Sequence, residues 1–312
     1  MTVKLGYLLP TRENIMRGHP ETGSLLDGAK RAHSLGFDSI WVGDSLLARP
    51  RHDPLTLLAA IAAAVPDVDL GPAVLLPALR NPVILAQQVA TIDQISEGRL
   101  ILGIGIAGDV PAIRAEFTAA GVPFEGRVGR MIEGFELSKA LWSGEPVTWD
   151  GRWQVEQGTL APVPYRPGGP PIWLAAGVPA GIERAAKHYD GWFPIGPDPV
   201  TFQQRRQLFV DAAVKAGRDP GDLTAAIYLT VAIDDDVESA EASIDTYLAG
   251  YYGAPPAVLR SIQACRGGPV DQVLGFIRSY VEAGAQHVVL RLVGDHQSML
   301  QELAGHRDEL VG

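Results

Sequence analysis

Cysteine is almost absent from this sequence. Its 312 residues include a single cysteine, Cys265, so no disulfide can form within the chain and a metal site built on several cysteines is excluded. Proteins of reducing compartments share this pattern. Long apolar runs are also missing, because the longest, such as residues 55–65, are too short to cross a bilayer. We expect no signal peptide, because the first residues run directly into an apolar, strand-like segment. We therefore expect a cytoplasmic protein with no membrane partner.

Positive charge is in short supply. Lysine and arginine number 26 against 36 aspartate and glutamate residues, which gives a formal net charge of −10. Such a chain is a poor partner for a nucleic-acid polyanion, so we expect no nucleic-acid partner. A phosphate-bearing cofactor is still compatible with this charge, because backbone amides and helix N-termini bind phosphate without a basic surface.

A repeating unit organises the chain: an amphipathic helix, a glycine, then a short apolar strand. Glycine after a helix fits the left-handed cap that turns the chain back, and continuously apolar strands suit a parallel sheet covered by helices. Eight such strands are predicted, at residues 3–9, 38–43, 70–76, 100–105, 171–176, 191–195, 223–232 and 286–292. Eight alternating units favour an α/β fold of the (β/α)8 TIM-barrel class. An open doubly wound sheet is the alternative.

Three segments interrupt this rhythm. We expect one domain over residues 1–312, with insertions near 106–125, 144–170 and 251–269. The Asp150-Gly151 pair between short β-like runs predicts a hairpin in the second insertion. The third, rich in proline and glycine, is predicted to be a surface loop.

Candidate functional residues are those that directly follow the strands, because (β/α)8 enzymes carry their sites there. Asp44 follows the second strand and can accept a ligand hydroxyl or move a proton, or else only cap the next loop. Residues 103–108 match G-x-G-x-x-G, but Gly103 still lies inside a strand, so a glycine-rich strand end is favoured over a dinucleotide fingerprint. Residues 177–181 join the fifth strand to a helix beginning near Pro179. This turn is either a phosphate site at a helix N-terminus or a plain connection. No spacing of His, Asp and Glu resembles a metal site.

Several ordered motifs resemble the bacterial-luciferase-like superfamily, and specifically its branch that uses the deazaflavin F420. They are Gly36-Phe-Asp-Ser-Ile-Trp-Val-Gly-Asp44, Asp53-Pro-Leu, Leu70-Gly-Pro-Ala-Val74, Asn81-Pro82, Ser96-Glu-Gly-Arg-Leu-Ile-Leu-Gly-Ile-Gly105, Leu141-Trp142, Pro170-Pro-Ile-Trp-Leu-Ala-Ala-Gly177 and Asp190-Gly-Trp192. The resemblance runs from Val3 to about Trp192. Beyond that point only the general strand–helix pattern agrees.

The resemblance implies a barrel with the cofactor across the C-terminal ends of its strands. It implies a non-prolyl cis peptide between Ala73 and Val74 behind the cofactor ring. The cofactor-binding residues that it implies are Asp44, Ser45, Ala73, Val74, Gly105, Ile106, Ala107, Ala175, Ala176, Gly177 and Val178, the last four around the phosphate.

The sequence departs from this pattern where many F420-dependent dehydrogenases have Asp-His. Here Ser45 follows Asp44, so His52 is a candidate for the missing histidine's role, and Asp109 lies near the place of an acidic residue of the relatives. The candidate catalytic residues are thus Asp44, His52 and Asp109.

The function implied is hydride transfer between F420 and a small organic substrate. An FMN-dependent monooxygenase that uses oxygen and a non-catalytic flavin- or F420-binding protein are the alternatives. We also expect a homodimer, which is common among such barrels.

Overall fold

Parallel strands alternating with helices make up most of the chain in the computed structural model, which describes residues 2–311. Contacts divide these residues into two units. Unit 1 comprises the chain up to Trp41 and from Ile172 onward, and unit 2 is Val42–Pro171. The prediction of a single domain stays a prediction.

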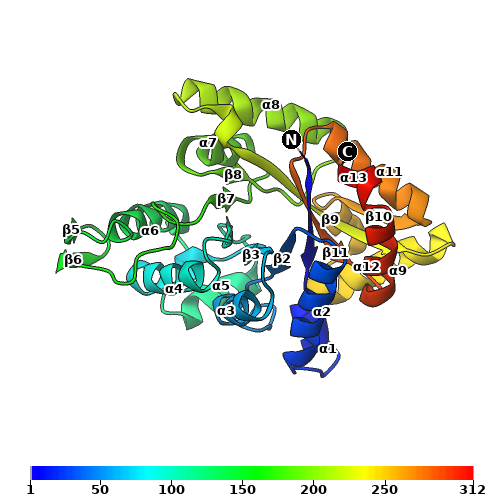
Figure 1. The fold of residues 1–312 in the computed structure, drawn as a ribbon, viewed down its shortest axis with the longest axis horizontal. Coiled ribbons are helices and arrows are strands. Elements are labelled where there is room, and N and C mark those ends of the chain that lie inside the picture. Colours follow the sequence, from blue (N-terminus) through cyan, green and yellow to red (C-terminus); the bar gives the residue numbers. More distant parts are fainter. Residues whose placement is uncertain (1, 312) are drawn as a thin grey trace. The chain divides into compact units, whose positions relative to one another are not determined.

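Unit 1 is built around six parallel strands in the order β2-β1-β11-β9-β8-β7 (Figure 1). The strands are β1 (Lys4–Leu8), β2 (Ser39–Val42), β7 (Ile172–Leu174), β8 (Gly191–Trp192), β9 (Thr224–Ile233) and β11 (His287–Leu292). The first strand, β1, pairs with the last, β11. Neighbouring first and last strands are typical of a (β/α)8 barrel, and the six strands of this unit end at β2 and β7.

Helices of unit 1 connect these strands. They are α1 (Thr11–Met16), α2 (Gly23–Ser34), α7 (Pro179–His188), α8 (Pro199–Lys215), α9 (Val237–Tyr252), α10 (Pro256–Arg260), α11 (Val270–Glu282), α12 (His296–Gly305) and α13 (Arg307–Val311), with a short 3-10 turn η2 (Pro220–Asp222). Several begin with proline at the first or second position, where no helical N–H is lost.

Unit 2 contributes the third and fourth barrel strands, β3 (Asp69–Pro72) and β4 (Leu102–Ile104). They run parallel, with bridges between Leu70 and Leu100 and between Leu75 and Ile104. The helices α3 (Pro54–Ala64), α4 (Pro82–Ile95), α5 (Pro111–Ala119) and α6 (Arg127–Leu141) and the turn η1 (Pro77–Leu79) complete it, and α4 packs against both α3 and α6. All eight predicted barrel strands are therefore present, and the (β/α)8 fold class is confirmed.

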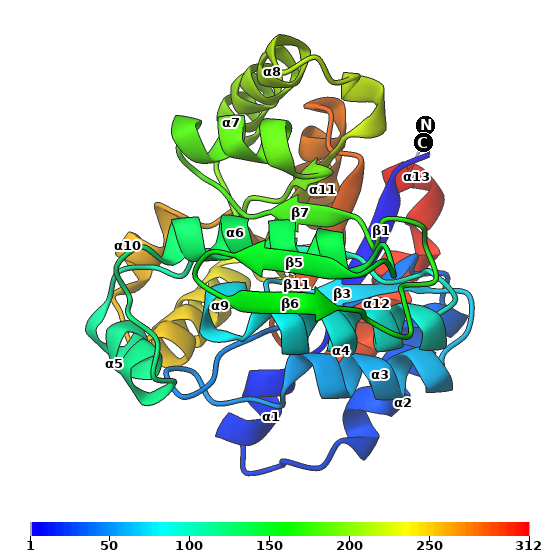
Figure 2. The same cartoon turned by 90° about the vertical axis from the view of Figure 1, so that its left-hand side faces the viewer.

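The second predicted insertion contains the expected hairpin. Strands β5 (Val147–Asp150) and β6 (Gln154–Gly158) pair antiparallel, and Figure 2 shows them beside α6. The first insertion contains α5. The third is not a surface loop, because residues 251–269 contain α10 and a strand, β10 (Cys265–Gly268), that pairs parallel with β9. The strand was not predicted because glycine has low β-propensity. It forms because it pairs with β9, a buried neighbour.

Aromatic rings fill the interior of unit 1. Trp41 stacks on Trp173 with ring centroids 5.6 Å apart, and His287 meets Trp41 edge-on at 5.7 Å. The Ser39 hydroxyl joins them, lying 2.7 Å from both Trp41 Nε1 and His287 Nε2. A Cβ at Gly6 would lie 2.4 Å from Ser39 Oγ, so only glycine fits beside this network. These polar groups are buried but paired, as burial requires.

Candidate functional site at the ends of the strands

The turn after β7 is the predicted phosphate site in unit 1. Ala175 and Ala176 are half-buried, whereas Gly177 and Val178 are exposed and lead into α7 at Pro179. Trp192 Nε1 donates to the Ala176 carbonyl over 2.7 Å, which ties the turn to β8. The N-terminus of a ten-residue helix thus faces solvent with the partial positive charge that binds anions.

Two glycines shape this turn in opposite ways. A Cβ built on Gly181, in the first turn of α7, would lie 2.8 Å from the Ala176 Cβ, so glycine lets the helix approach the strand end. A Cβ built on Gly177 meets no atom within 4 Å, so nothing in the chain itself explains this glycine. The open space beside Gly177 is where a bound group can approach the backbone.

The ends of β3 and β4 form the predicted ring site in unit 2. The Ala73–Val74 peptide bond is cis, as the resemblance implied. A Cβ on Gly105 would lie 2.6 Å from Val74 Cγ2, so glycine is needed where the two strand ends meet. Ala107 has φ +63°, a left-handed conformation that is uncommon for residues other than glycine and is often found at ligand sites. Arg127 Nε holds the loop by donating to the Ile106 carbonyl over 2.8 Å.

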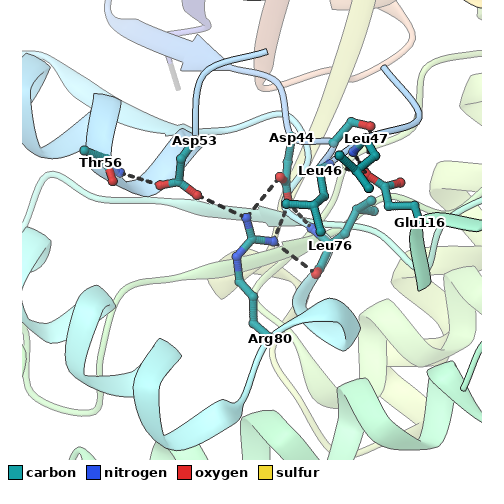
Figure 3. Close-up of polar contacts among 9 residues, drawn as sticks. Asp44, Leu46, Leu47, Asp53, Thr56, Leu76, Arg80 and Glu116 are labelled. Atoms are coloured by element: carbon teal, nitrogen blue, oxygen red, sulfur yellow. Dashed lines mark hydrogen bonds and ion pairs between the residues drawn. The ribbon is translucent and has the colours of Figure 1, made fainter. Parts of the chain in front are cut away.

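Asp44 lies at the end of β2, and its carboxylate accepts hydrogen bonds from a side chain and from the backbone (Figure 3). Its side chain is 2% exposed, and Arg80 donates to both carboxylate oxygens, at 2.6 and 3.0 Å. The Leu76 amide donates to the same carboxylate over 2.8 Å. Arg80 also reaches Asp53, 3.5 Å away, which caps α3 through the Thr56 amide. Burial lowers the pKa of Arg80, but the two carboxylates outweigh it and raise the pKa overall.

Ser45, the residue found where histidine was expected, is bonded to a carboxylate that sequence reasoning missed. Its hydroxyl donates to Glu116 Oε1 over 3.0 Å and accepts the Arg49 amide over 2.9 Å. The amides of Leu46 and Leu47 donate to the same glutamate oxygen, the second over 2.8 Å. Glu116 lies on α5 and is 1% exposed. No nearby sequence signal links residues 71 positions apart.

The two remaining catalytic candidates lie in loops of unit 2. His52 is half-buried, one residue before the α3 cap. Asp109 is exposed and forms a bidentate pair with Arg114, at 2.6 and 2.9 Å. The hydrogen bond from Arg114 lowers the pKa of Asp109, so its carboxylate holds its charge near neutral pH.

Unit 1 contains a buried arginine that was not among the predicted site residues. Arg291, at the end of β11, is 1% exposed and is held by hydrogen bonds to Thr230, Tyr252 and Gln263. Its guanidinium lies 5.1 to 5.5 Å from the ring centroids of Tyr228, Tyr247, Tyr251 and Tyr252. Burial lowers its pKa, but the tyrosines raise it overall. The cluster is a fixed positive charge at the strand ends.

Glu13 is a second missed acid. It follows β1 on the short helix α1, is 8% exposed and accepts a hydrogen bond from the Tyr247 hydroxyl. Burial raises the pKa of Tyr247, which keeps that hydroxyl protonated as a donor. Its position directly after the first strand was the one signal in the sequence.

A cavity of about 530 Å³ borders Glu13 in unit 1. Arg17, Tyr247, Leu292 and His296 are among its lining residues. Tyr247 both lines the cavity and lies beside the Arg291 guanidinium, so the cavity borders the arginine cluster. Its size suits a small molecule.

No group of three or more candidate metal ligands occurs within residues 2–311. Over the same residues, no helix is both long enough and apolar enough to span a membrane.

Glycine-rich turns, a helix N-terminus and buried charges at the strand ends are typical of α/β-barrel enzymes that bind their ligands there. The sequence profile described as luciferase-like monooxygenase matches residues 3–269. The chain therefore belongs to the luciferase-like monooxygenase family and is an enzyme of that family.

Two curated relatives show the breadth of the family. The 5,10-methylenetetrahydromethanopterin reductase of Methanolobus tindarius is 32% identical over 232 residues, covering 74% of this chain and 68% of the relative. The F420-dependent glucose-6-phosphate dehydrogenase of Nocardia farcinica is 28% identical over 306 residues, covering 89% of this chain and 90% of the relative.

Solved structures agree on the fold. An F420-dependent secondary alcohol dehydrogenase in complex with an F420–acetone adduct superposes with a TM-score of 0.84 at 20% identity, covering 99% of both chains. The oxygenating constituent of 3,6-diketocamphane monooxygenase from Pseudomonas putida, in complex with FMN, superposes with a TM-score of 0.77 at 20% identity, covering 99% and 98%.

Proposed function

We propose that this enzyme is an F420-dependent oxidoreductase that transfers a hydride between the deazaflavin and a small organic substrate. The observation that carries the proposal is the exposed turn at the start of α7, where Gly177 leaves open space beside a helix N-terminus. The F420-dependent relatives support the choice of cofactor over other phosphate-bearing molecules. The hydride chemistry belongs to F420 when it is bound.

In unit 1, residues 175–178 would hold the cofactor phosphate. The amides at the start of α7 and the helix dipole supply the attraction, so no basic side chain is required. This agrees with a chain whose net charge is −10.

In unit 2, Ala73, Val74 and residues 105–107 would line the cofactor ring. Small side chains at positions 73, 105 and 107 leave room for a planar group. The ion pair of Asp44 with Arg80 would hold the β2 end rigid beside them. Rigid support of this kind is what orients reactants for transfer.

Proton transfer to or from the substrate needs a titratable group at the site. Asp44 and Asp109 each have a bidentate arginine partner, so we assign them to holding the loops in place. His52 in unit 2 and Glu13 in unit 1 are our proposed acid–base candidates.

A titration with both cofactors tests the proposal. Purified protein is titrated with F420 and, separately, with FMN, and binding is followed by fluorescence. We expect saturable F420 binding with FMN at least about a hundredfold weaker, a difference of about 2.7 kcal/mol. Tight FMN binding without F420 binding would instead favour the oxygen-using monooxygenase, which the FMN complex of the camphane enzyme supports as the second candidate.

Bound F420 that exchanges no hydride with any of a panel of alcohols and carbonyl compounds would favour a non-catalytic binding protein. The cytoplasmic location and the homodimer stay predictions.

A further inference from the structure

We propose that Glu116 is a positioning residue that fixes the loop after β2 in its ligand-binding conformation. The inference rests on the proposed function, because Ser45 belongs to that loop and to the proposed cofactor site. Glu116 itself is on α5 and follows a different strand, β4.

The first ground is the way the carboxylate is used. One oxygen, Oε1, accepts from three donors that are consecutive in the chain: the Ser45 hydroxyl and the amides of Leu46 and Leu47. The other oxygen, Oε2, is buried and has no hydrogen-bond partner within residues 2–311. Every hydrogen bond found for this buried carboxylate therefore goes to a single three-residue segment.

The second ground is what the segment presents. Although Glu116 is 1% exposed, the side chains it anchors at Leu46 and Leu47 are 54% and 58% exposed. Leaving a carboxylate oxygen unpaired in the interior is unfavourable, and so is exposing two adjacent leucines. Both features lower the stability of the folded protein. Features that cost stability are typical of functional sites.

The third ground is position. The segment directly follows Asp44, whose carboxylate is fixed by Arg80 and the Leu76 amide. Two buried carboxylates thus hold consecutive residues at the C-terminal end of a barrel strand, where enzymes of this fold bind their ligands. Asp44 fixes the strand end, and Glu116 fixes the loop that leaves it.

A matched control exists in the same unit. Asp93 on α4 is 0% exposed and accepts the Arg166 amide over 2.9 Å. It lies near the end of its helix, next to the turn that enters β4, and thus at the opposite end of the strands from the proposed site. Changing it disturbs a buried carboxylate without touching the β2 loop.

The experiment compares Glu116→Ala, Glu116→Gln and Asp93→Ala with the unaltered protein. Amide hydrogen exchange at Leu46 and Leu47, F420 affinity and thermal stability are measured for each. Glu116→Ala is expected to speed exchange at both amides and weaken F420 binding about tenfold. Glu116→Gln keeps an acceptor oxygen and should restore most of the affinity. Asp93→Ala should lower stability while F420 affinity stays within about twofold.

The outcomes separate the two proposals. If the unaltered protein binds F420 and Glu116→Ala binds it equally well, the positioning role is wrong while the function stands. If Asp93→Ala weakens binding as much as Glu116→Ala, the effect is general destabilisation and the positioning role is again wrong. If the unaltered protein binds no F420, the proposed function fails, and accelerated exchange at Leu46 and Leu47 in Glu116→Ala alone would still show that Glu116 anchors the loop.

Discussion

Single residues of this chain divide into those whose identity the fold explains and those it does not. Gly105 and Gly181 are required by close contacts with Val74 and Ala176. Gly177 has open space around it, and its identity is explained only by something that binds there. Asp44 and Glu116 are not free acids. Both are buried carboxylates whose hydrogen bonds hold nearby residues in place. Substitutions at these positions can therefore separate effects on ligand binding from effects on folding.

Replacing Gly177 with valine should weaken F420 binding about tenfold or more, because the side chain would occupy the space that the phosphate needs. The melting temperature should stay unchanged, since a Cβ there meets no atom within 4 Å. Gly23, the first residue of α2, has the same open surroundings and makes Gly23→Val the control. Equal F420 affinity in the two variants would show that the α7 turn is not the phosphate site.

Replacing Asp44 with asparagine should lower the free energy of unfolding by about 3 kcal/mol, at the low end for buried ion pairs because the Arg80 side chain is 20% exposed. Urea unfolding measures this loss. Asp109→Asn removes a bidentate pair that is exposed, and it should cause no measurable loss. Equal stability of both variants would mean that the Asp44 pair does not hold the β2 end.

At the scale of elements, the strands that form the barrel interior depend on one neutral histidine. His287 on β11 is 2% exposed, and burial lowers its pKa to about 3. Its imidazole shares one hydrogen bond with the Ser39 hydroxyl and lies against the side chains of Trp41 and Trp173. A charge there would be stranded in an apolar layer.

The stability of the protein should accordingly fall as the pH drops below 6.5. Well above pH 6.5 the histidine is neutral in both the folded and unfolded states, so it contributes no pH dependence there. As the pH falls through 6.5, the unfolded chain binds a proton that the folded state does not, which lowers the stability by about 2.3 kcal/mol between pH 6.5 and 4.5. Urea unfolding of the unaltered protein and of His287→Gln at both pH values should show this difference; identical pH dependence in the two would contradict the neutral buried histidine.

Elements were predictable where a local pattern determines them. The eight barrel strands are short and mostly apolar runs, and the hairpin follows from Asp150-Gly151. Strand β10 was missed because Cys265-Arg-Gly-Gly268 has little β-propensity, and its partner β9 lies more than thirty positions earlier in the chain. The partners of the site residues were missed for the same reason. Arg80 is 36 positions from Asp44, and Glu116 is 71 positions from Ser45, so neither pair leaves a local signal.

At the scale of the whole molecule, the chain is a (β/α)8 barrel of the luciferase-like monooxygenase family whose strand ends bear its candidate ligand residues. Position after a strand singled out the α7 turn as either a phosphate site or a plain connection, because the fold places its sites there. The residues at the ends of β3 and β4 came from the family resemblance, and their role stays a prediction. The same rule selected Asp44 and Asp109, but it could not show that each carboxylate is paired with an arginine. Chemistry at the site therefore depends on tertiary contacts that only the structure supplies.

A crystal structure of the protein grown with F420 would show where the cofactor binds. In unit 1 we expect density for a phosphate that accepts hydrogen bonds from the amides at 177–178, and in unit 2 density for a planar ring against Val74. A phosphate bound elsewhere, or crystals that take up FMN at these residues and exclude F420, would contradict this expectation.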